Sequence, residues 1–135
     1  MRTIKFRGKG VNTGKWFYGS TATYGGKAFL LNVGRLLRID QVDVIPDTVG
    51  QYTCLVDNEG RDIFEGDIIF HEGSTFGGVV QWHPNGYFFI NDSYGKKYPR
   101  CNSYRALGDM LEGKFFIVKG NIHDNPEMIE KGGEE

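Results

Sequence analysis

The sequence lacks most of the features that mark secreted, membrane-spanning or disulfide-rich proteins. Its two cysteines, Cys54 and Cys101, lie far apart and form no CxxC pair, so no disulfide framework is expected. No apolar run approaches the roughly 18 residues that a membrane span requires. The opening residues, MRTIKFRGKG, have no apolar stretch behind their basic side chains, so we expect no secretory signal. These absences predict a cytoplasmic protein with reduced thiols and no membrane partner.

Proline is also scarce, with four residues, whereas glycine is abundant, with 20, and aromatic residues make up 14% of the chain. Aromatic and β-branched runs that are broken by glycine-rich turns are typical of β-structure. A length of 135 residues favours one compact domain, or one domain with a smaller appended unit. The composition therefore predicts an all-β, mainly antiparallel protein.

Short runs of alternating apolar and polar residues fill the first part of the chain. TIKFRG and KWFYGS predict a hairpin over residues 2–20, and KAFLLNV predicts a third strand. In LLRIDQVDVIP the alternation slips by one residue at Asp40–Gln41, which predicts a bulge or tight turn there. Residues 1–50 are thus predicted to form a basic, β-hairpin-rich N-terminal part.

The rest of the chain predicts a small SH3-like barrel over residues 51–131, with one or two short helices near its end. Strands follow one another at intervals of about 8–12 residues, which is typical of small antiparallel barrels. DNEG and HPNG have the residues of tight turns. SYRALGDMLEG has helical spacing, with Ser103 as candidate cap, and Pro126 begins a second helical turn. Residues 132–135 are predicted to be a disordered tail.

Charge is distributed unevenly although its total is only −1. Residues 1–39 hold eight basic and no acidic residues, and residues 40–135 hold eight basic and seventeen acidic ones. Such asymmetry predicts a binding surface. The candidate contact residues are Arg2, Lys5, Arg7, Lys9, Lys15, Arg35 and Arg38.

Two kinds of partner fit this basic segment, beside the simpler reading of a solvated strand face with its aromatic residues turned into the core. Trp16, Tyr18 and Tyr24 are interleaved with the cations, and small β-barrels bind single-stranded nucleic acid with such surfaces. Alternatively, the segment pairs with the acidic remainder, either within one chain or between copies as in a head-to-tail ring, or it pairs with another protein. The slightly negative total charge favours the protein partner.

Residues suited to catalysis or metal binding are few and poorly spaced. His71, His83 and His123 match no metal-ligand motif, and GKGVNTGK lacks the spacing of a phosphate-binding loop. Cys101 lies between basic residues, so a Cys–His pair is the nearest approach to a hydrolase-like centre. The sequence therefore predicts no catalytic residue, no cofactor and no metal, and a protein that is not an enzyme.

Three stretches together resemble one protein family. VGQYTCLVDNEGRDIFEGDIIF, the GGVV at residues 77–80 and the closing VKGNIHDNPEMI are similar to the motifs of YopX-like proteins of phages and prophages. The chain departs from the family at Cys54, where glycine is usual, at Glu59, and at Phe64, where tyrosine is usual. We expect none of these changes to threaten the fold.

The resemblance implies a phage-encoded, all-β protein of the host cytoplasm, and it implies no catalytic motif or substrate. We therefore expect a non-enzymatic accessory protein of unknown biochemical role. It is expected to act as a homo-oligomer or by binding a phage or host protein. Nucleic-acid binding through the basic N-terminal segment is the alternative. The glycine, aspartate and asparagine positions of the first motif are predicted to have mainly structural roles.

Overall fold

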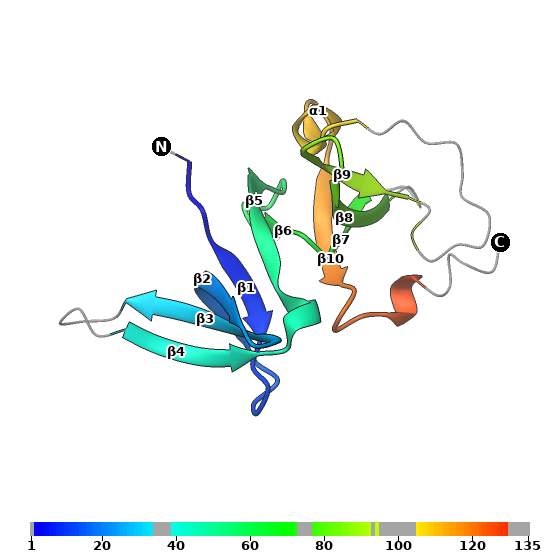
Figure 1. Cartoon of the computed structure of the whole chain (residues 1–135). Coiled ribbons are helices and arrows are strands. Elements are labelled where there is room, and N and C mark those ends of the chain that lie inside the picture. Colours follow the sequence, from blue (N-terminus) through cyan, green and yellow to red (C-terminus); the bar gives the residue numbers. More distant parts are fainter. Residues whose placement is uncertain (1, 34–38, 73–76, 93, 95–104, 130–135) are drawn as a thin grey trace. The chain divides into compact units, whose positions relative to one another are not determined.

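The computed structural model describes residues 2–33, 39–72, 77–92, 94 and 105–129 (Figure 1). These residues form antiparallel strands with short helices, which confirms the all-β prediction. The chain divides into two compact units, Met1–Cys54 and Leu55–Glu135. None of the described helices has the length and apolarity needed to cross a membrane.

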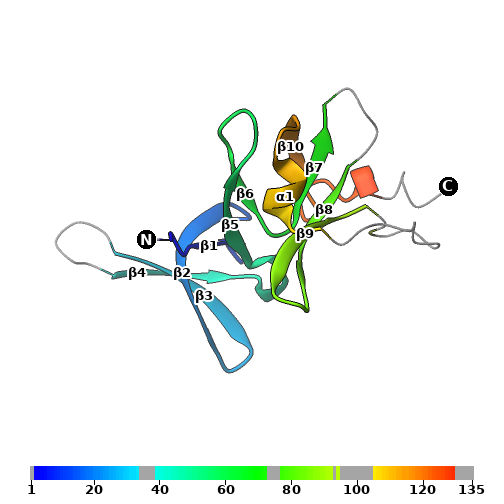
Figure 2. The same cartoon turned by 90° about the horizontal axis from the view of Figure 1, so that it is seen from above.

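The first unit is a curled antiparallel sheet. Its strands are β1 (Phe6–Lys9), β2 (Trp16–Tyr24), β3 (Lys27–Val33), β4 (Ile39–Val44) and the first part of β5 (Gly50–Val56), and they lie in the order β4-β3-β2-β1-β5. A 3₁₀ turn, η2 (Pro46–Thr48), connects β4 to β5. Figure 2 shows the β2–β3 hairpin extending past the short β1 strand, which pairs with β2 only as far as Gly19.

The end of β4 returns to the end of β1, so the first unit wraps round a small core. Gly10 forms a bridge with Val44, and Ile45 donates its backbone N–H to the Lys9 carbonyl. A Cβ at Gly8 would lie 3.0 Å from the Val44 side chain, so the close approach of β1 and β4 favours a residue without a side chain. Ala28, Leu30 and Val44 are buried here, and Phe6, Phe17, Val42 and Val49 pack against them.

The predicted bulge at Asp40–Gln41 is wrong. β4 pairs with β3 without interruption from Val33–Ile39 to Ala28–Val44. The alternation slips because Ile39 lies on the outer face, where 66% of it is exposed, while Val42 and Val44 face the core. The change in alternation therefore reflects one exposed apolar residue, Ile39, in a strand that is regular.

The second unit begins with the end of β5, which turns into β6 (Asp62–Phe64), and continues as a four-stranded sheet. The strands of this sheet are β7 (Asp67–His71), β8 (Gly77–His83), β9 (Tyr87–Asn91) and β10 (Phe116–Asn121), in the order β10-β7-β8-β9. The β8–β9 turn closes as predicted, with Gly86 at a φ of 95° and its N–H donated to the His83 carbonyl.

In the described part of the second unit, one core cluster joins six buried apolar residues, one each from β6, β7, β8, β9, the helix and β10. They are Ile63, Ile69, Val80, Ile90, Leu107 and Phe116. The helix α1 (Leu107–Leu111) is shorter than the sequence predicted and begins at Ala106 without a side-chain cap; Ser103 lies outside the described residues. Its Leu107 is buried, and Met110 and Leu111 pack on the core.

A closed barrel is absent from the strand order of the described residues, where each sheet has two ends. In the second unit the turn after β5 nevertheless reaches β10. Asn58 donates its backbone N–H to the Phe116 carbonyl, and its side-chain Oδ1 accepts the Phe116 N–H. The β5–β6 turn thus contacts β10 without a continuous strand pairing between them. The all-β class holds, and the described strands form two open sheets in place of the predicted barrel.

Candidate interaction site

The first sequence motif centres on Asp57, whose side chain is completely buried. Its Oδ1 accepts the backbone N–H groups of Glu59 and Arg61, each at 2.9 Å. Its Oδ2 accepts the Val118 N–H at 3.0 Å and the Arg61 Nε–H at 3.1 Å. One carboxylate therefore closes its own turn and ties that turn to β10.

The same contacts decide the protonation of Asp57. Burial alone raises the pKa of a carboxyl group, but hydrogen bonds from Val118, Arg61 and Glu59 favour the charged form, and the net effect lowers the Asp57 pKa from 3.8. The group is therefore an ionised structural anchor, and it has no accessible oxygen for acid–base chemistry.

The closing motif is held by asparagine side chains. Asn121 Oδ1 accepts the N–H groups of His123 and Asp124, and Asn125 Oδ1 accepts the Asn121 N–H. A Cβ at Gly120 would come within 2.3 Å of Asn125 Oδ1, so only glycine leaves room for this side chain. The motif is a compact turn that ends β10.

Gly66 connects the two motifs through its backbone. Its N–H is donated to the Val80 carbonyl, and its own carbonyl accepts the Ile122 N–H. Its φ is 93°, a region that favours glycine. The motif residues of the second unit described above thus have structural roles, whereas the start of the first motif, with Tyr52, lies in the first unit.

Cations and aromatic rings share the outer face of the first sheet. Lys5, Arg7 and Lys9 alternate along the start of the chain, so they lie on the same side. Register places Trp16 across from Lys9, and Tyr18 across from Arg7. We call this surface, formed by these five residues and Tyr52, the cation–aromatic face.

The cations of this face lie over the rings. Lys5 Nζ is 4.7 Å from the centre of the Tyr52 ring, and Arg7 Cζ is 4.6 Å from the centre of Trp16. Lys9 Nζ lies 5.9 Å from the same Trp16 ring. These distances suit cation–π attraction. The aromatic residues are therefore not turned into the core, as the simpler reading had them. The same holds for Tyr52, which the first motif assigns to the core but which is half-buried beneath Lys5.

The predicted contact residues differ in how exposed their side chains are. Arg2 and Lys15 are exposed, and Lys5 and Lys9 are half-buried. Arg7, the third candidate contact residue, is buried, since only 7% of it is exposed. Arg35 and Arg38 lie outside the described residues. The alternation of charge along β1 could be read from the sequence, but Arg7 is covered because it packs on the large Trp16 ring of the neighbouring strand.

The residues considered for catalysis do not gather in the described part of the chain. There, no group of three or more His, Cys, Asp or Glu residues is placed to hold a metal ion. His83 stacks on Tyr87, with ring centres 4.6 Å apart, and its Nδ1 accepts the Asn85 N–H in the hairpin turn. His71 packs edge-on against Phe116. Cys101 lies outside the described residues.

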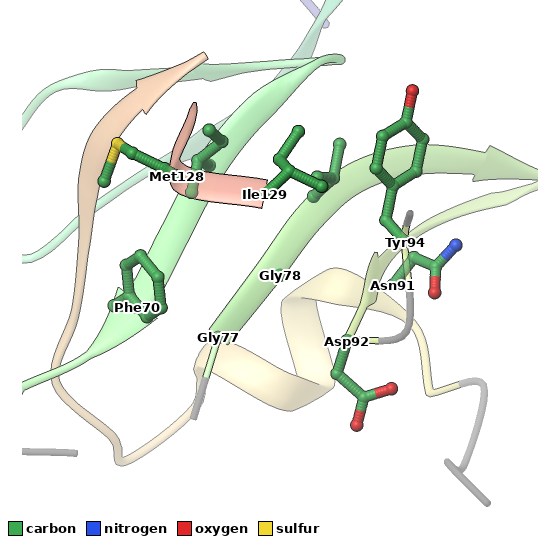
Figure 3. A pocket seen from close by; sticks show the side chains of 10 residues that line it. Phe70, Gly77, Gly78, Asn91, Asp92, Tyr94, Met128 and Ile129 are labelled. Atoms are coloured by element: carbon green, nitrogen blue, oxygen red, sulfur yellow. The ribbon is translucent and has the colours of Figure 1, made fainter. Parts of the chain in front are cut away.

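The second unit contains a small pocket of about 100 Å³. Figure 3 shows Phe70 and Met128 on one side of it and Asn91, Asp92 and Tyr94 on the other. Its remaining lining residues are Ile68, Gly77, Gly78, Val79 and Ile129. The volume is far below the roughly 300 Å³ or more that small-molecule sites usually have.

The first unit has a wider and shallower hollow of about 360 Å³ where β4 returns to β1. Asn12, Thr13, Gln41 and Asp43 supply polar groups, and Phe17 forms part of its wall. Apart from Phe17, these side chains are exposed. The hollow has no buried polar group that would fix a ligand in one orientation.

Comparison with known proteins supports the resemblance seen in the sequence. The profile of the family described as YopX protein matches residues 5–130. The chain belongs to the YopX family. No curated protein matches it significantly. Among solved structures, the YopX chain is similar to the crystal structure of protein EF1440 from Enterococcus faecalis, with a TM-score of 0.58 and 19% identity. That likeness covers 96% of this chain and 100% of the other, and it extends to the fold alone.

The boundary between the two units also divides the charge of this YopX protein. The first unit, residues 1–54, has eight basic and three acidic residues, a net charge of +5. The second, residues 55–135, has eight basic and fourteen acidic residues, a net charge of −6. Charges of opposite sign and nearly equal size thus belong to separate structural units.

Proposed function

We propose that this YopX protein is a non-enzymatic accessory protein that associates with itself, the basic first unit of one copy contacting the acidic second unit of the next. The single observation that carries the proposal is the division of charge into +5 and −6 between the two units. Opposite charges on two surfaces of one protomer favour a head-to-tail contact, which closes into a ring when the rotation permits. The resemblance implies that the protein serves a phage or prophage in the host cytoplasm.

The cation–aromatic face is the surface of the first unit that this contact would use. Tyr18 is 48% exposed and lies across from Arg7, and tyrosine, tryptophan and arginine are enriched at protein interfaces. The neighbouring exposed Arg2 and Lys15 would add attraction at long range without needing a fixed geometry.

Nucleic acid is the second candidate partner, because cations and rings lie on one face. Binding of single strands depends on bases stacking on exposed aromatic rings. Here Lys5 covers Tyr52, and Arg7 and Lys9 lie over Trp16, so the rings already have cationic neighbours. This arrangement favours a protein partner over a stacked base.

Light scattering on the full chain tests the proposal. At low salt we expect a mass several times 15.2 kDa, which falls towards the protomer mass as salt screens the charges. The triple variant Lys5→Gln, Lys9→Gln and Lys15→Gln should associate more weakly. Lys119→Gln, an exposed cation of the second unit, is the matched control. A protomer mass for the wild-type protein at every salt concentration would refute self-association.

Fluorescence anisotropy with a labelled single-stranded oligonucleotide tests the second candidate. Nucleic-acid binding would give an affinity that falls steeply with salt, and the triple variant would reduce the slope. Under the proposal we expect no salt-dependent binding at micromolar protein. Tight binding of the oligonucleotide by a protein that stays monomeric would assign the cation–aromatic face to nucleic acid.

A further inference from the structure

The first sheet has an open strand edge where β1 ends. β1 pairs with β2 only as far as Gly19, and residues 20–24 of β2 continue beyond it with β3 on their other side. Figure 2 shows this part of the β2–β3 hairpin extending past β1. In the described part of the chain, no strand pairs with the free side of these residues. We call residues 20–24, with the sequence STATY, the open β2 edge.

Strand register fixes which backbone groups point out of this edge. Asp43 directs its carbonyl away from β3, because that oxygen accepts a backbone N–H from the β1–β2 turn. Asp43 lies across from Phe29, and Phe29 lies across from Ala22. Since residues directly opposite each other either both point toward one another or both point away, Phe29 bonds to β2 and Ala22 bonds to β3. Thr21 and Thr23, on either side of Ala22, therefore direct their N–H and C=O groups out of the open β2 edge.

The residues of this edge do not protect it from pairing with another strand. Open edges of natural sheets usually carry charged side chains, proline or a bulge, which prevent such pairing. β4, an outer strand of the same sheet, has Asp40 and Asp43, and its end is closed by the bridge from Val44 to Gly10. The open β2 edge has neither a charge nor a proline, and threonine, which favours strands, occurs in it twice. It is therefore suited to receive a further strand.

We infer that the open β2 edge pairs with the same edge of a second copy, antiparallel and about a two-fold axis at Ala22. This contact goes beyond the head-to-tail contact of the proposed function, since it uses another surface and needs no ion pair. A two-fold axis gives both copies the same contacts, so the segment must complement itself. Because the segment is uncharged, it meets its own copy without repulsion between like charges.

The side chains of the segment complement one another in this register. Ala22 faces Ala22 of the second copy in a pair without hydrogen bonds, whose Cα atoms approach to about 4.5 Å, and its small side chain suits that approach. Thr21 faces Thr23 of the second copy, and the two exchange their N–H···O=C bonds. Ser20 faces Tyr24, so a small side chain lies beside a large ring, which is 82% exposed in the single chain. Burial of this ring adds apolar contact to the hydrogen bonds.

The contact is small, which determines how it must be measured. A strand segment of this length is far below the roughly 20–30 residues a side of a standard interface, so we expect a dissociation constant of about 0.1 mM. Backbone hydrogen bonds and apolar contacts depend less on salt than ion pairs between exposed side chains do. The contact should therefore persist at about 0.5 M salt, where the head-to-tail contact is screened.

Exchange of Ala22 tests the inference, with sedimentation equilibrium of the full chain at about 0.5 M salt and up to about 0.5 mM protein as the readout. Ala22→Lys and Ala22→Glu should each weaken dimer formation by about 5-fold, because like charges meet at the axis. A mixture of the two variants should recover most of this loss. Gln41→Lys and Gln41→Glu, at an exposed position of β4, are the matched controls and should have no effect alone or mixed. Ala22 is exposed as well, and circular dichroism checks that each variant is folded.

Each outcome decides a different point. Recovery in the mixture requires that Ala22 faces its own copy, so it would establish the edge and the register together. A wild-type dimer that the Ala22 variants do not weaken, or that their mixture does not restore, would overturn the inference. A wild-type monomer under these conditions would also overturn it and leave the head-to-tail contact, measured at low salt, standing.

Hydrogen exchange of the Thr21 and Thr23 amides separates the other possible occupants if the protein is monomeric. Slow exchange would mean that another segment of the same chain covers the open β2 edge. Fast exchange would mean that the edge is open to a strand of a different protein. Either result replaces the second copy as the occupant.

Discussion

The two units of this protein reach a stable sheet by different means. The described part of the second unit has a cluster of six buried apolar residues and a buried aspartate whose carboxylate accepts several hydrogen bonds. The first unit has three buried apolar residues, and a good part of its outer face is packed by cations lying on rings. The second unit is thus held mainly by its apolar core, whereas the first unit also depends on contacts between charged and aromatic side chains at its surface.

The largest effect is expected from the core of the second unit. Phe116 is completely buried, and Phe116→Ala should lower the free energy of unfolding by about 3–5 kcal/mol, since it leaves a large cavity. Its neighbour Phe115 is 39% exposed, so Phe115→Ala should change stability by about 0.5 kcal/mol or less. Chemical denaturation monitored by circular dichroism measures both. Equal losses for the two variants would contradict the assigned core.

The next effect concerns the buried carboxylate. Asp57→Asn replaces one acceptor oxygen by an N–H₂ group facing N–H donors, and it should cost roughly 2–3 kcal/mol at neutral pH. Because the folded pKa of Asp57 is lowered, the stability it contributes is present above its unfolded value near 3.8 and is lost as the pH falls through the lower folded value. The difference between wild type and variant should therefore shrink below about pH 4.

Denaturation at pH 7 and at pH 3 measures this dependence. Asp62→Asn, which removes an exposed acid of the adjoining strand β6, is the control for the loss of one negative charge. A difference between wild type and Asp57→Asn that stays constant from pH 7 to pH 3 would mean that the carboxylate is not held in its charged form.

A smaller effect is expected in the first unit. Trp16→Leu removes the ring that lies beside both Arg7 and Lys9, and it should destabilise the first unit by about 1–2 kcal/mol. Trp16→Phe keeps a ring and should recover part of the loss. Hydrogen exchange of the β1 and β2 amides is the readout, because it reports on this unit separately. Equal protection in Trp16→Leu and the wild type would show that the rings do not stabilise the sheet.

Turns and strands of this protein could be predicted from the sequence because their signals are local. HPNG and DNEG specify their turns by residue type alone, and most strands alternate with period two. The closure between distant segments could not be predicted. The bond from Val118 to Asp57 joins residues that are far apart in the chain, and no local pattern announces it. Arg7 illustrates the same limit. The alternation of residues along β1 predicts which face of the sheet Arg7 lies on, but its burial depends on the Trp16 ring of the next strand.

Cys54 is visible in the sequence as a departure from the family, but its effect on the backbone is visible only in the structure. Cys54 replaces a glycine that the resemblance to YopX-like proteins leads us to expect, and it has a φ of 68°. A side chain in this left-handed region costs roughly 1–2 kcal/mol relative to the usual conformations. The substitution leaves the fold intact, and it places a strained residue at the last position of the first unit.

The smallest predicted effect follows from this strain, and it has the opposite sign to the others. Cys54→Gly should stabilise the protein by about 0.5 kcal/mol, because relief of the strained φ outweighs the greater freedom of glycine in the unfolded chain. Cys54→Ala keeps the strain and loses the 3.1 Å contact from Sγ to the Thr3 carbonyl, so it should be slightly less stable than the wild type. Thermal denaturation of the three proteins under reducing conditions should rank them Gly, Cys, Ala. If Cys54→Gly were no more stable than Cys54→Ala, the left-handed conformation at this position would not be the one adopted in solution.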